Sequence, residues 1–542
     1  MNYRYFGAML DVSRNGVMRP SQIKQFILYL EKMGYNMLEL YTEDTYKIDG
    51  EPLFGYMRGA YTKEEIQDVD KFAREHGIEL VPCIQTLAHM NNLKKIPQYQ
   101  EYFDTKDILL TGDEEVYALI DKMFKQMSEA YTSRIINIGM DEAGMVGRGT
   151  YLDRNGYRTR FDIIREHLDR VLEIADKYGF KCHMWSDMFF RLANDDQYRP
   201  EGYDPITIPD EVIEKTPKNV GLAYWDYANT SRDKYNRMLS AHKQFGCEVW
   251  YAGGAWCWQG FAPENAFSMK AMLPAMQSCR ENNIENVLMT LWGDDGNECS
   301  PFAMLPSLYA IRKFADGIEN MEEIKRGFKE TLGFDFDDFM TLDLPTTIMK
   351  GGVQDLRFNT IPSLLTYNDP FIGLFDYGLM QIDRIDFASY ALQIKKARKN
   401  MGELDYIFDY VEKICDFLAE KAYIGIDARR AYKAGDRKAL AEIAKRCARG
   451  AKKMDAFIKS YYYRWDRENK PFGWEVQDIR LGGAKQRLLT CKDKINDYLK
   501  GKRQSIEELE EEVMSLADRD LLRHHRYTDI CTPSSFAHCI YD

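Results

Sequence analysis

The sequence has little of what membrane-bound or secreted proteins need. No apolar run approaches the about 20 residues of a membrane-spanning helix, so we expect no membrane partner. The opening residues MNYRYFGAMLDVSRNG carry no apolar stretch behind a basic start, so no signal peptide is predicted. The 11 cysteines are scattered and form no C-x-x-C pair, a pattern typical of reduced thiols. Together these absences predict a cytoplasmic protein.

Several catalytic signatures are also absent. There is no H-x-H or H-E-x-x-H pair for a metal, and no G-x-S-x-G turn for a serine nucleophile. The pair Gly253-Gly254 lacks a following Lys-Ser/Thr, so we interpret it as a turn and not as a phosphate loop. His183 lies alone within a predicted strand and is interpreted as a hydrogen-bonded core residue. We therefore expect no metal and no organic cofactor.

Basic charge is in short supply, because Lys and Arg total 73 against 85 Asp and Glu, for a formal net charge of −12. An acidic chain of this kind argues against non-specific binding of nucleic acid. Aromatic side chains are plentiful, at 13% of 542 residues, and hydrophobic residues make up 45%. This composition predicts an ordered globular protein with more than one domain.

One unit repeats through the first ~320 residues: a short apolar run, a loop, a helical pattern and a glycine. Glycine directly after a helix adopts the left-handed conformation that ends it. Thr62 and Glu65 have the spacing of a capping box, and Ser21, Asp113 and Ser231 lie near the starts of other helices. The predicted helix ends are Gly34, Gly77, Gly179 and Gly246, with Asn282-Asn283 in the same role.

The apolar runs are the strand candidates. They are mostly apolar and do not alternate cleanly, as expected of strands buried on both faces. Eight such strands alternating with helices predict a (β/α)8 TIM barrel. A doubly wound sheet is the alternative, but no G-x-G-x-x-G follows the first run. The predicted strands are Phe6–Val12, Asn36–Tyr41, Ile78–Ile84, Arg134–Met140, Lys181–Ser186, Val220–Trp225, Cys247–Ala252 and Asn286–Trp292.

From about Gly333 the pattern changes to long charged amphipathic stretches, which predict a mainly α-helical C-terminal domain. We assign residues 1–325 to the barrel and 335–542 to the helical domain. The segment Tyr367–Pro370 is interpreted as interdomain packing, with a contact to the barrel rim or a homodimer contact left open. Ser505 and Glu508 have the spacing of another capping box. The predicted helices are Phe387–Met401, Asp405–Ile424, Lys438–Trp465 and Ser505–Leu522.

In a barrel of this class the active site lies at the C-terminal ends of the strands. The fifth predicted strand, for example, ends in Trp185-Ser186-Asp187. Aromatic walls with a few polar groups suit a sugar, because its CH faces stack on rings while its hydroxyls need fixed donors and acceptors. The candidates at the strand ends are Arg14, Asp44, His89, Asp141, Glu142, Trp185, Trp225, Tyr227, Trp256, Trp292 and Asp294.

Asp141 and Glu142 are adjacent carboxylates at the end of the fourth predicted strand. Mutual repulsion and partial burial raise a carboxyl pKa and suit a general acid. An ordinary retaining glycosidase holds its acid and nucleophile about 5 Å apart across the scissile bond, which neighbouring residues do poorly. Adjacency favours substrate-assisted hydrolysis of 2-acetamido sugars, in which one carboxyl protonates the leaving oxygen and its neighbour orients the acetamido group.

Three strings resemble glycoside hydrolase family 20, the β-N-acetylhexosaminidases. Ile136–Glu142 is similar to the catalytic fourth-strand motif of that family, and Met9–Arg14 to its first-strand motif. Leu291–Asp294 resembles the eighth-strand motif, with Asp where many members have Glu. The resemblance covers the whole predicted barrel. It implies a bacterial subgroup with a helical C-terminal region and without the usual N-terminal α/β domain.

The resemblance implies roles position by position. Glu142 matches the general acid/base, and Asp141 the residue that holds the acetamido N–H and stabilises the oxazolinium-like intermediate. Arg14 matches the arginine that binds O3 and O4 of the sugar, and Asp294 the carboxylate near O4 and O6. Trp292 matches the side chain that stacks under the ring.

Further roles follow from the same resemblance. His89 matches a histidine near the general acid, and Asp44, or Glu43 beside it, an acidic residue linked to that histidine. The family often has a Tyr after strand seven that binds the acetamido carbonyl, whereas this chain has Trp256-Cys257-Trp258. Our hypothesis is that Tyr227 supplies that hydroxyl. The candidates for the apolar cage around the acetamido methyl are Trp185, Trp225 and Trp256.

The sequence therefore predicts an exo-β-N-acetylhexosaminidase that releases terminal β-linked GlcNAc, or GalNAc, with retention through an oxazoline intermediate. Its expected partner is a small glycan with a terminal N-acetylhexosamine. Two alternatives stay open: a catalytically silent sugar-binding barrel, and a barrel glycosidase acting on sugars without a 2-acetamido group.

Overall fold

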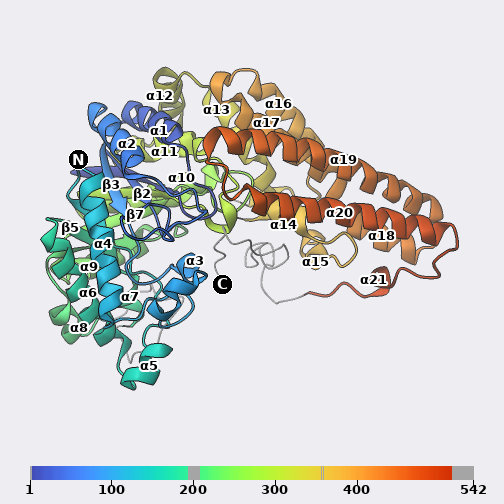
Figure 1. The fold of residues 1–542 in the computed structure, drawn as a ribbon. Coiled ribbons are helices and arrows are strands. Elements are labelled where there is room, and N and C mark those ends of the chain that lie inside the picture. Colours follow the sequence, from blue (N-terminus) through green and yellow to red (C-terminus); the bar gives the residue numbers. More distant parts are fainter. Residues whose placement is uncertain (1–2, 193–207, 356, 358, 516–542) are drawn as a thin grey trace. The chain divides into compact units, whose positions relative to one another are not determined.

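The computed structural model describes residues 3–192, 208–355, 357 and 359–515. The chain divides into two compact units (Figure 1). The first comprises Met1–Ala255, Ser268–Trp292 and Ser307–Ile324. The second comprises Trp256–Phe267, Gly293–Pro306 and Lys325–Asp542, so it includes two segments that follow barrel strands.

The first unit holds a closed barrel of eight strands in sequence order. Every neighbouring pair is parallel, and β1 closes the barrel on β8. This confirms the predicted (β/α)8 barrel and excludes the doubly wound sheet. The strands are β1 (Tyr5–Asp11), β2 (Met37–Tyr41), β3 (Glu79–Cys83), β4 (Ile135–Asn137), β5 (Lys181–Trp185), β6 (Val220–Trp225), β7 (Val249–Gly254) and β8 (Asn286–Leu291).

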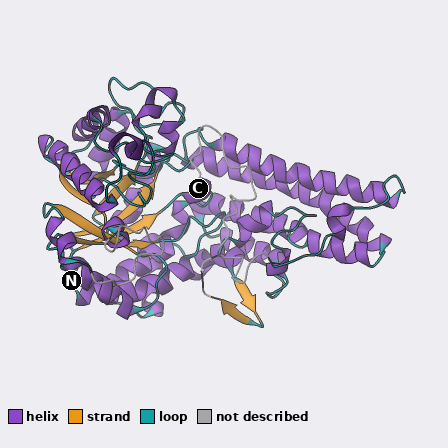
Figure 2. Cartoon of the chain, turned by 90° about the horizontal axis from the view of Figure 1, so that it is seen from below, coloured by secondary structure: helices purple, strands orange, loops and turns teal. Residues whose placement is uncertain are grey.

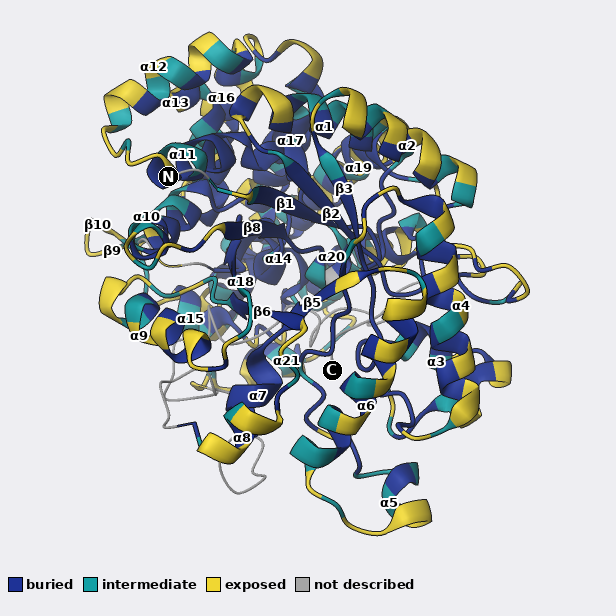
Figure 3. Cartoon of the chain, turned by 90° about the vertical axis from the view of Figure 1, so that its left-hand side faces the viewer, coloured by how far each residue is buried: buried dark blue, intermediate teal, exposed yellow. Residues whose placement is uncertain are grey.

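The strands form the buried centre of the first unit, and helices enclose them (Figure 2). All six residues of β8 are buried, as expected of a strand with side chains packed on both faces. Figure 3 shows β1, β2, β3 and β8 in the colour of buried residues, while α2, α4 and α6 present exposed residues outward. The register pairs Asp11 with Tyr41 and Tyr41 with Cys83, so these strands end at one level.

Local signals in the sequence position the helices around the barrel. Thr62 and Glu65 form the predicted capping box, and Asp113 and Ser231 accept N–H groups as N-caps. Gly34 ends α1 in the left-handed conformation, with φ 83°. The helices are α1 (Pro20–Met33), α2 (Lys63–Glu75), α3 (Asn91–Lys94), α4 (Glu114–Ala130), α5 (Thr150–Asn155), α6 (Arg160–Lys177), α7 (Asp187–Arg191), α8 (Asp210–Lys215), α9 (Arg232–Lys243), α10 (Asn265–Glu281) and α11 (Leu305–Ala315).

The second unit is mainly helical, as predicted, and its longest helices pack side by side as α17 with α19 and α19 with α20 (Figure 1). No helix in the described parts of the chain combines the length and apolarity needed to cross a bilayer. The elements are α12 (Met321–Leu332), α13 (Phe336–Met340), β9 (Ile348–Lys350), β10 (Val353–Asp355), α14 (Ile361–Tyr367), α15 (Asp376–Leu379), α16 (Phe387–Arg398), α17 (Asp405–Lys421), α18 (Ile424–Lys433), α19 (Arg437–Glu468), α20 (Trp474–Leu499) and α21 (Glu507–Glu510).

Some predicted elements are wrong. Of the helix predicted over Ser505–Leu522, only Glu507–Glu510 is helical within the described residues, and the part beyond 515 lies outside them. Ile506 is the N-cap and makes no side-chain cap bond, so the predicted capping box at Ser505 is absent. No individual helix was predicted at α20, although the region was predicted to be mainly helical, because Gly482-Gly483 weakens the helical signal.

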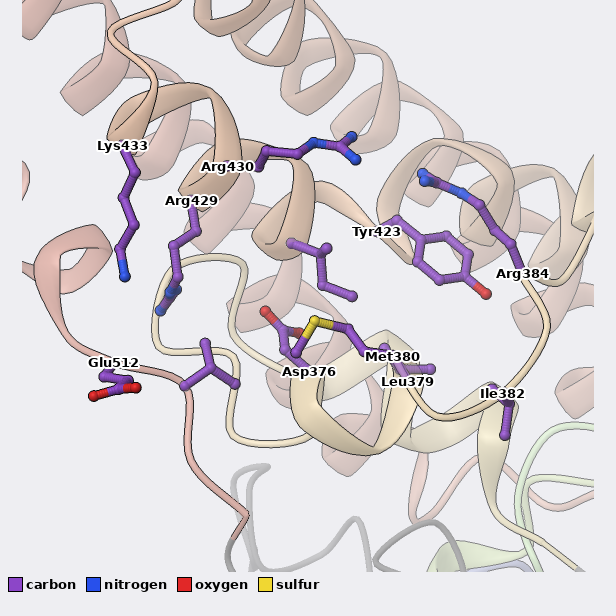
Figure 4. A pocket seen from close by; sticks show the side chains of 12 residues that line it. Asp376, Leu379, Met380, Ile382, Arg384, Tyr423, Arg429, Arg430, Lys433 and Glu512 are labelled. Atoms are coloured by element: carbon purple, nitrogen blue, oxygen red, sulfur yellow. The ribbon is translucent and has the colours of Figure 1, made fainter. Parts of the chain in front are cut away.

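A cavity of about 580 Å³ lies within the second unit, lined from α15, α18 and the segment after α21 (Figure 4). Its arginine side chains already have partners. Arg384 and Arg430 pair with Asp427 at 2.8 and 2.9 Å, and Arg429 donates to the Phe371 carbonyl at 2.7 Å. None of the lining residues is a predicted site residue, so the cavity carries no part of the predicted chemistry.

Candidate active site

The turn after β4 carries the two adjacent carboxylates, and its backbone is strained. Gly139, Met140 and Glu142 have positive φ values of 70°, 71° and 52°. A Cβ at Gly139 would lie 2.0 Å from the Gln85 side-chain oxygen, so only glycine fits there. Met140 and Glu142 are held in a conformation that L-residues rarely adopt, and such strain gathers at functional sites. The turn is therefore fixed by its surroundings.

Gln85, which follows β3, fixes both the backbone and one carboxylate of this turn. Its Oε1 accepts the Met140 N–H at 3.3 Å, and its Nε2 donates to Asp141 Oδ1 at 3.1 Å. The same Nε2 donates to the Tyr41 hydroxyl at 3.1 Å. Because both ends of the amide are engaged, the Gln85 side chain has one orientation and the Asp141 carboxylate is held in place.

Asp141 is buried and faces a cation. His89 Nε2 lies 3.2 Å from Asp141 Oδ2. Burial alone would raise the pKa of Asp141, but His89, the Gln85 hydrogen bond and Arg14 outweigh it and hold the pKa below its usual value. For His89, burial opposes the charged form, yet Asp141 raises its pKa to about 9. At neutral pH the pair is therefore an aspartate anion beside an imidazolium.

Glu142 has the opposite electrostatic character. Burial raises its pKa, and the charge of Asp141 adds to the rise, while His89 and Arg191 moderate it. Its side chain is 32% exposed, and its two oxygens face different cations: Oε2 lies 4.0 Å from His89 Nε2, and Oε1 lies 3.7 Å from Arg191 Nη2. Two adjacent carboxyls thus have pKa values shifted in opposite directions, which suits an anion beside an acid.

Arg14 lies among acids and aromatic rings at the end of β1. Its Nη1 pairs with Asp11 Oδ2 at 2.9 Å, and its Nε lies 3.8 Å from Glu43 Oε1. The guanidinium carbon lies 4.8 Å from the Trp292 ring centre and 4.9 Å from that of Tyr41, within the range of cation–π attraction. These contacts fix a cation at the strand ends, and its binding of sugar hydroxyls stays a prediction.

Glu43 marks a further shifted group in the same cluster. Burial raises its pKa to about 7, against the opposing effect of Arg14. Its neighbour Asp44 pairs instead with Arg58, at 3.1 Å between Oδ1 and Nε. The predicted link between Asp44 and His89 therefore stays a prediction, and the described partner of Asp44 is an arginine.

Four predicted aromatic residues line the same strand ends. Trp185 and Trp292 contact each other with ring centres 5.9 Å apart, and Tyr41 packs edge-on against Trp292 at 4.8 Å. Trp225 and Tyr227 stack at 5.4 Å. Tyr227 is half-buried, so its ring supports Trp225 while its position leaves access from solvent. These residues give the site apolar walls.

Trp256 and Asp294 belong to the second unit. Trp256 follows β7 and stacks on Trp258 at 4.4 Å between ring centres. Asp294 is half-buried. It begins a short 3₁₀ helix, Asp294–Gly296, shortly after the end of β8. Both lie in the chain after a strand end, as the sequence indicated, and their approach to substrate stays a prediction.

Three residues that support the carboxylates were not singled out from the sequence. Gln85 follows the third predicted strand and Asp187 ends the fifth, but neither is among the predicted site residues. Asp187 Oδ2 accepts the Glu142 N–H at 3.1 Å and pairs with Arg191 Nε at 3.0 Å. A signal existed, because Arg191 stands four residues after a strand-end aspartate, the spacing of a helical ion pair.

Ligand atoms of His89, Asp141 and Glu142 lie within 4.8 Å of one another and could in principle surround a cation. A metal would need His89 neutral, because an imidazolium has no lone pair to donate. The pKa of about 9 keeps His89 protonated at neutral pH. A metal would have to displace that proton and break the His89–Asp141 pair at 3.2 Å, and the absence of a metal stays a prediction.

Comparisons with known proteins agree on one family. The model of the glycosyl hydrolase family 20 catalytic domain matches residues 3–236, and that of the Glycoside Hydrolase 20C C-terminal domain matches residues 337–527. Hexosaminidase D of Bos taurus is 22% identical over 263 residues, which cover 47% of this chain and 70% of that protein. Hexosaminidase D of Homo sapiens is 21% identical over 278 residues, which cover 49% of this chain and 53% of that protein.

Among solved structures, a GH20 exo-β-N-acetylglucosaminidase from Vibrio harveyi is 17% identical, with a TM-score of 0.47. That alignment covers 63% of this chain and 58% of the other, so the chain spans only part of some of the proteins it matches. The two family models lie on the barrel and on the helical region. From these matches, the chain belongs to glycoside hydrolase family 20.

Proposed function

We propose that the chain is an exo-acting β-N-acetylhexosaminidase that works by substrate assistance. The observation that carries the proposal is that two neighbouring carboxyls have pKa values shifted in opposite directions. Asp141 is held as an anion by His89 and Gln85, while the pKa of Glu142 is raised by burial. One anion to orient an amide and one acid to protonate a leaving group are what this mechanism needs.

In the first step the acetamido oxygen of the substrate attacks C1. The bond from C1 to the leaving oxygen breaks, and Glu142 gives that oxygen its proton. Asp141 accepts a hydrogen bond from the acetamido N–H, which aligns the carbonyl oxygen and stabilises the positive charge that develops on the ring. The product of this step is an oxazolinium ion and a free alcohol.

In the second step water adds to C1 while Glu142, now a carboxylate, takes a proton from it. The bond between C1 and the acetamido oxygen breaks, and the acetamido group is restored. Two successive inversions at C1 give overall retention. Glu142 ends the cycle protonated, so no metal and no organic cofactor enters either step.

The surrounding residues would bind the sugar. Arg14 and Asp294 bind hydroxyls, Trp292 stacks under the ring, and the Tyr227 O–H donates a hydrogen bond to the acetamido carbonyl oxygen. Trp185, Trp225 and Trp256 form the apolar cage around the acetamido methyl, and His89, with Asp44 behind it, supports the carboxylates. If Tyr227→Phe leaves kcat unchanged, the carbonyl contact belongs to another residue.

The expected substrate is a small glycan with a terminal β-linked GlcNAc, or GalNAc. The names of the relatives, Hexosaminidase D, support this substrate class. We also propose a cytoplasmic location, since the nine cysteines in the described part of the chain are free and eight of them are buried. A homodimer contact at Tyr367–Pro370 remains a hypothesis.

The test compares an aryl β-N-acetylglucosaminide with the matching β-glucoside, which has a 2-hydroxyl in place of the acetamido group. We expect turnover of the first and little or none of the second. Faster turnover of the glucoside would contradict substrate assistance and favour a barrel glycosidase for other sugars. Turnover of neither, with binding of GlcNAc, would favour the catalytically silent sugar-binding barrel.

A further inference from the structure

Helix α7 carries a buried ion pair beside the proposed general acid. Asp187 is its first residue and Arg191 its last, so the two stand one helical turn apart. Arg191 Nε lies 3.0 Å from Asp187 Oδ2, with side-chain exposures of 5% and 0%. Both charges of a buried ion pair lose their hydration, so such a pair often adds little net stability. Its position beside Glu142 therefore suggests a role in function.

Both members of this pair contact Glu142. Asp187 Oδ2 accepts the Glu142 backbone N–H at 3.1 Å, and Arg191 Nη2 lies 3.7 Å from Glu142 Oε1. The N–H belongs to a residue in the left-handed conformation, with φ 52°. A hydrogen bond from that strained peptide to a buried carboxylate is a means of holding it there.

Arg191 also has a fixed position of its own. Its guanidinium carbon lies 5.7 Å from the Trp225 ring centre, within the range of cation–π attraction. The Glu142 carboxyl therefore lies between two fixed cations, His89 near Oε2 and Arg191 near Oε1. The His89 contact is part of the proposed site, whereas the Arg191 contact is an addition to it.

We propose that Asp187 and Arg191 are positioning residues for Glu142: Asp187 anchors its strained peptide, and Arg191 orients its carboxyl toward the leaving oxygen. This inference rests on the proposed function. Neither residue is assigned a contact with substrate, so each acts through Glu142 alone. The expected signature is a defect in proton donation with the rest of the site intact.

The charges around Glu142 determine how the pH profile should change. The groups that act on it are His89 from the loop after β3, Asp141 beside it, Arg14 after β1, and Arg191 with Asp187 from α7. Arg191 lowers the pKa of Glu142. Its removal should raise that pKa and move the alkaline limb of kcat/KM to higher pH, because Glu142 stays protonated for longer.

The experiment measures Arg191→Met with two aryl β-N-acetylglucosaminides, one with a good and one with a poor leaving group. We expect kcat for the poor leaving group to fall by about 10- to 100-fold, because a misplaced acid transfers its proton badly. The good leaving group needs little protonation, so its kcat should fall far less. The alkaline limb should move upward with the poor leaving group, whose turnover depends on the acid.

Asp187 is tested by a pair of variants. Asp187→Asn keeps an oxygen that can accept the Glu142 N–H, whereas Asp187→Ala removes it. We expect the asparagine to recover most of the kcat that the alanine loses on the poor leaving group. Arg165→Met is the control, because Arg165 and Asp169 form a half-buried pair of the same spacing on α6, at 2.7 Å.

Three results would overturn the inference while wild-type activity upholds the proposed function. One is an equal loss for good and poor leaving groups in Arg191→Met with an unmoved alkaline limb. Another is identical kcat for Asp187→Asn and Asp187→Ala. Should Arg191→Met fail to fold, Arg191→Gln, which also removes the charge, decides: unchanged leaving-group dependence and limb in that variant would reject a positioning role. If the wild type turns over neither substrate, the proposed function itself fails.

Discussion

Two glutamates, one in each unit, show different ways of holding a carboxylate. Glu468 on α19 is 1% exposed and fully hydrogen-bonded. Its Oε1 accepts from the Ser300 and Tyr406 hydroxyls at 2.6 and 2.8 Å, and its Oε2 accepts from Arg464 at 2.9 Å. Glu142 after β4 is 32% exposed at its side chain, with its cations at 3.7 and 4.0 Å.

The difference fits a structural carboxylate at Glu468 and the proposed proton donor at Glu142. Short bonds on every side of Glu468 stabilise its anion and join α17, α19 and the segment after β8 within the second unit. At Glu142 the backbone is fixed by Asp187, while the carboxyl keeps a raised pKa and access to solvent. A group that must give and take a proton cannot also be fully engaged by its neighbours.

The largest effect should come from Glu142→Gln. It leaves shape and hydrogen-bonding capacity nearly intact but removes the transferable proton. We expect kcat to fall by about 10²- to 10⁴-fold for poor leaving groups and much less for activated aryl groups. Steady-state kinetics over a series of aryl leaving groups checks this. An equal loss across the series would make Glu142 resemble Glu468 and would reject it as the acid.

Glu468→Gln should affect stability and not chemistry. It leaves Arg464 buried without its charged partner, and we expect the free energy of unfolding to fall by about 3–5 kcal/mol. Denaturant unfolding followed by circular dichroism measures the loss. At a temperature where the variant is folded, kcat should equal that of the wild type. A large fall in kcat at unchanged stability would contradict the comparison.

A smaller effect concerns pH. Because the folded pKa of His89 is raised from 6.5 to about 9, its stabilising contribution is complete below about pH 6.5 and is lost as the pH rises through 9. Asp141, with a lowered pKa, contributes above its ordinary value of 3.8 and loses its contribution as the pH falls through the folded value.

We therefore expect the melting temperature of the wild type to fall between pH 6.5 and 9 more than that of His89→Gln, which lacks the imidazole at position 89. Thermal unfolding of both proteins across that range is the measurement. Parallel curves would mean that His89 is neutral beside Asp141, and would remove the grounds for an imidazolium at the site.

Removal of metal ions should have the smallest effect, because we expect none on kcat. Prolonged treatment with a chelator should leave kcat unchanged, because the paired and protonated His89 makes a poor ligand. Loss of activity restored by a divalent cation would show that His89, Asp141 and Glu142 hold a metal. Glu142 would then be a ligand, and its assignment as the acid would need revision.

The barrel could be predicted because the sequence signals for its strands and helices involve residues close together in the chain. Apolar runs, capping residues and helix-ending glycines each depend on a few neighbours, and β6 (Val220–Trp225) has the predicted bounds. The fourth strand, predicted over Arg134–Met140, is shorter at Ile135–Asn137. The left-handed residues that present the carboxylates end it early, and apolar character alone cannot reveal that turn.

The rest depends on contacts between distant segments. Asp187 and Glu142 are 45 residues apart, and neither indicates the other in the sequence. The short hairpin of β9 and β10 was missed although its turn is Gly351-Gly352, a pair suited to the positive φ values of 58° and 77°. Its strands of three residues are too short for an alternating pattern to stand out.

The most direct measurement is inhibition by N-acetylglucosamine-thiazoline, in which a ring is already closed between C1 and the former acetamido group. If Asp141 stabilises an oxazolinium-like intermediate, this compound should inhibit competitively and bind at least about 100-fold more tightly than GlcNAc. Asp141→Asn should lose most of that preference. Equal affinity for the thiazoline and GlcNAc in the wild type would contradict substrate assistance.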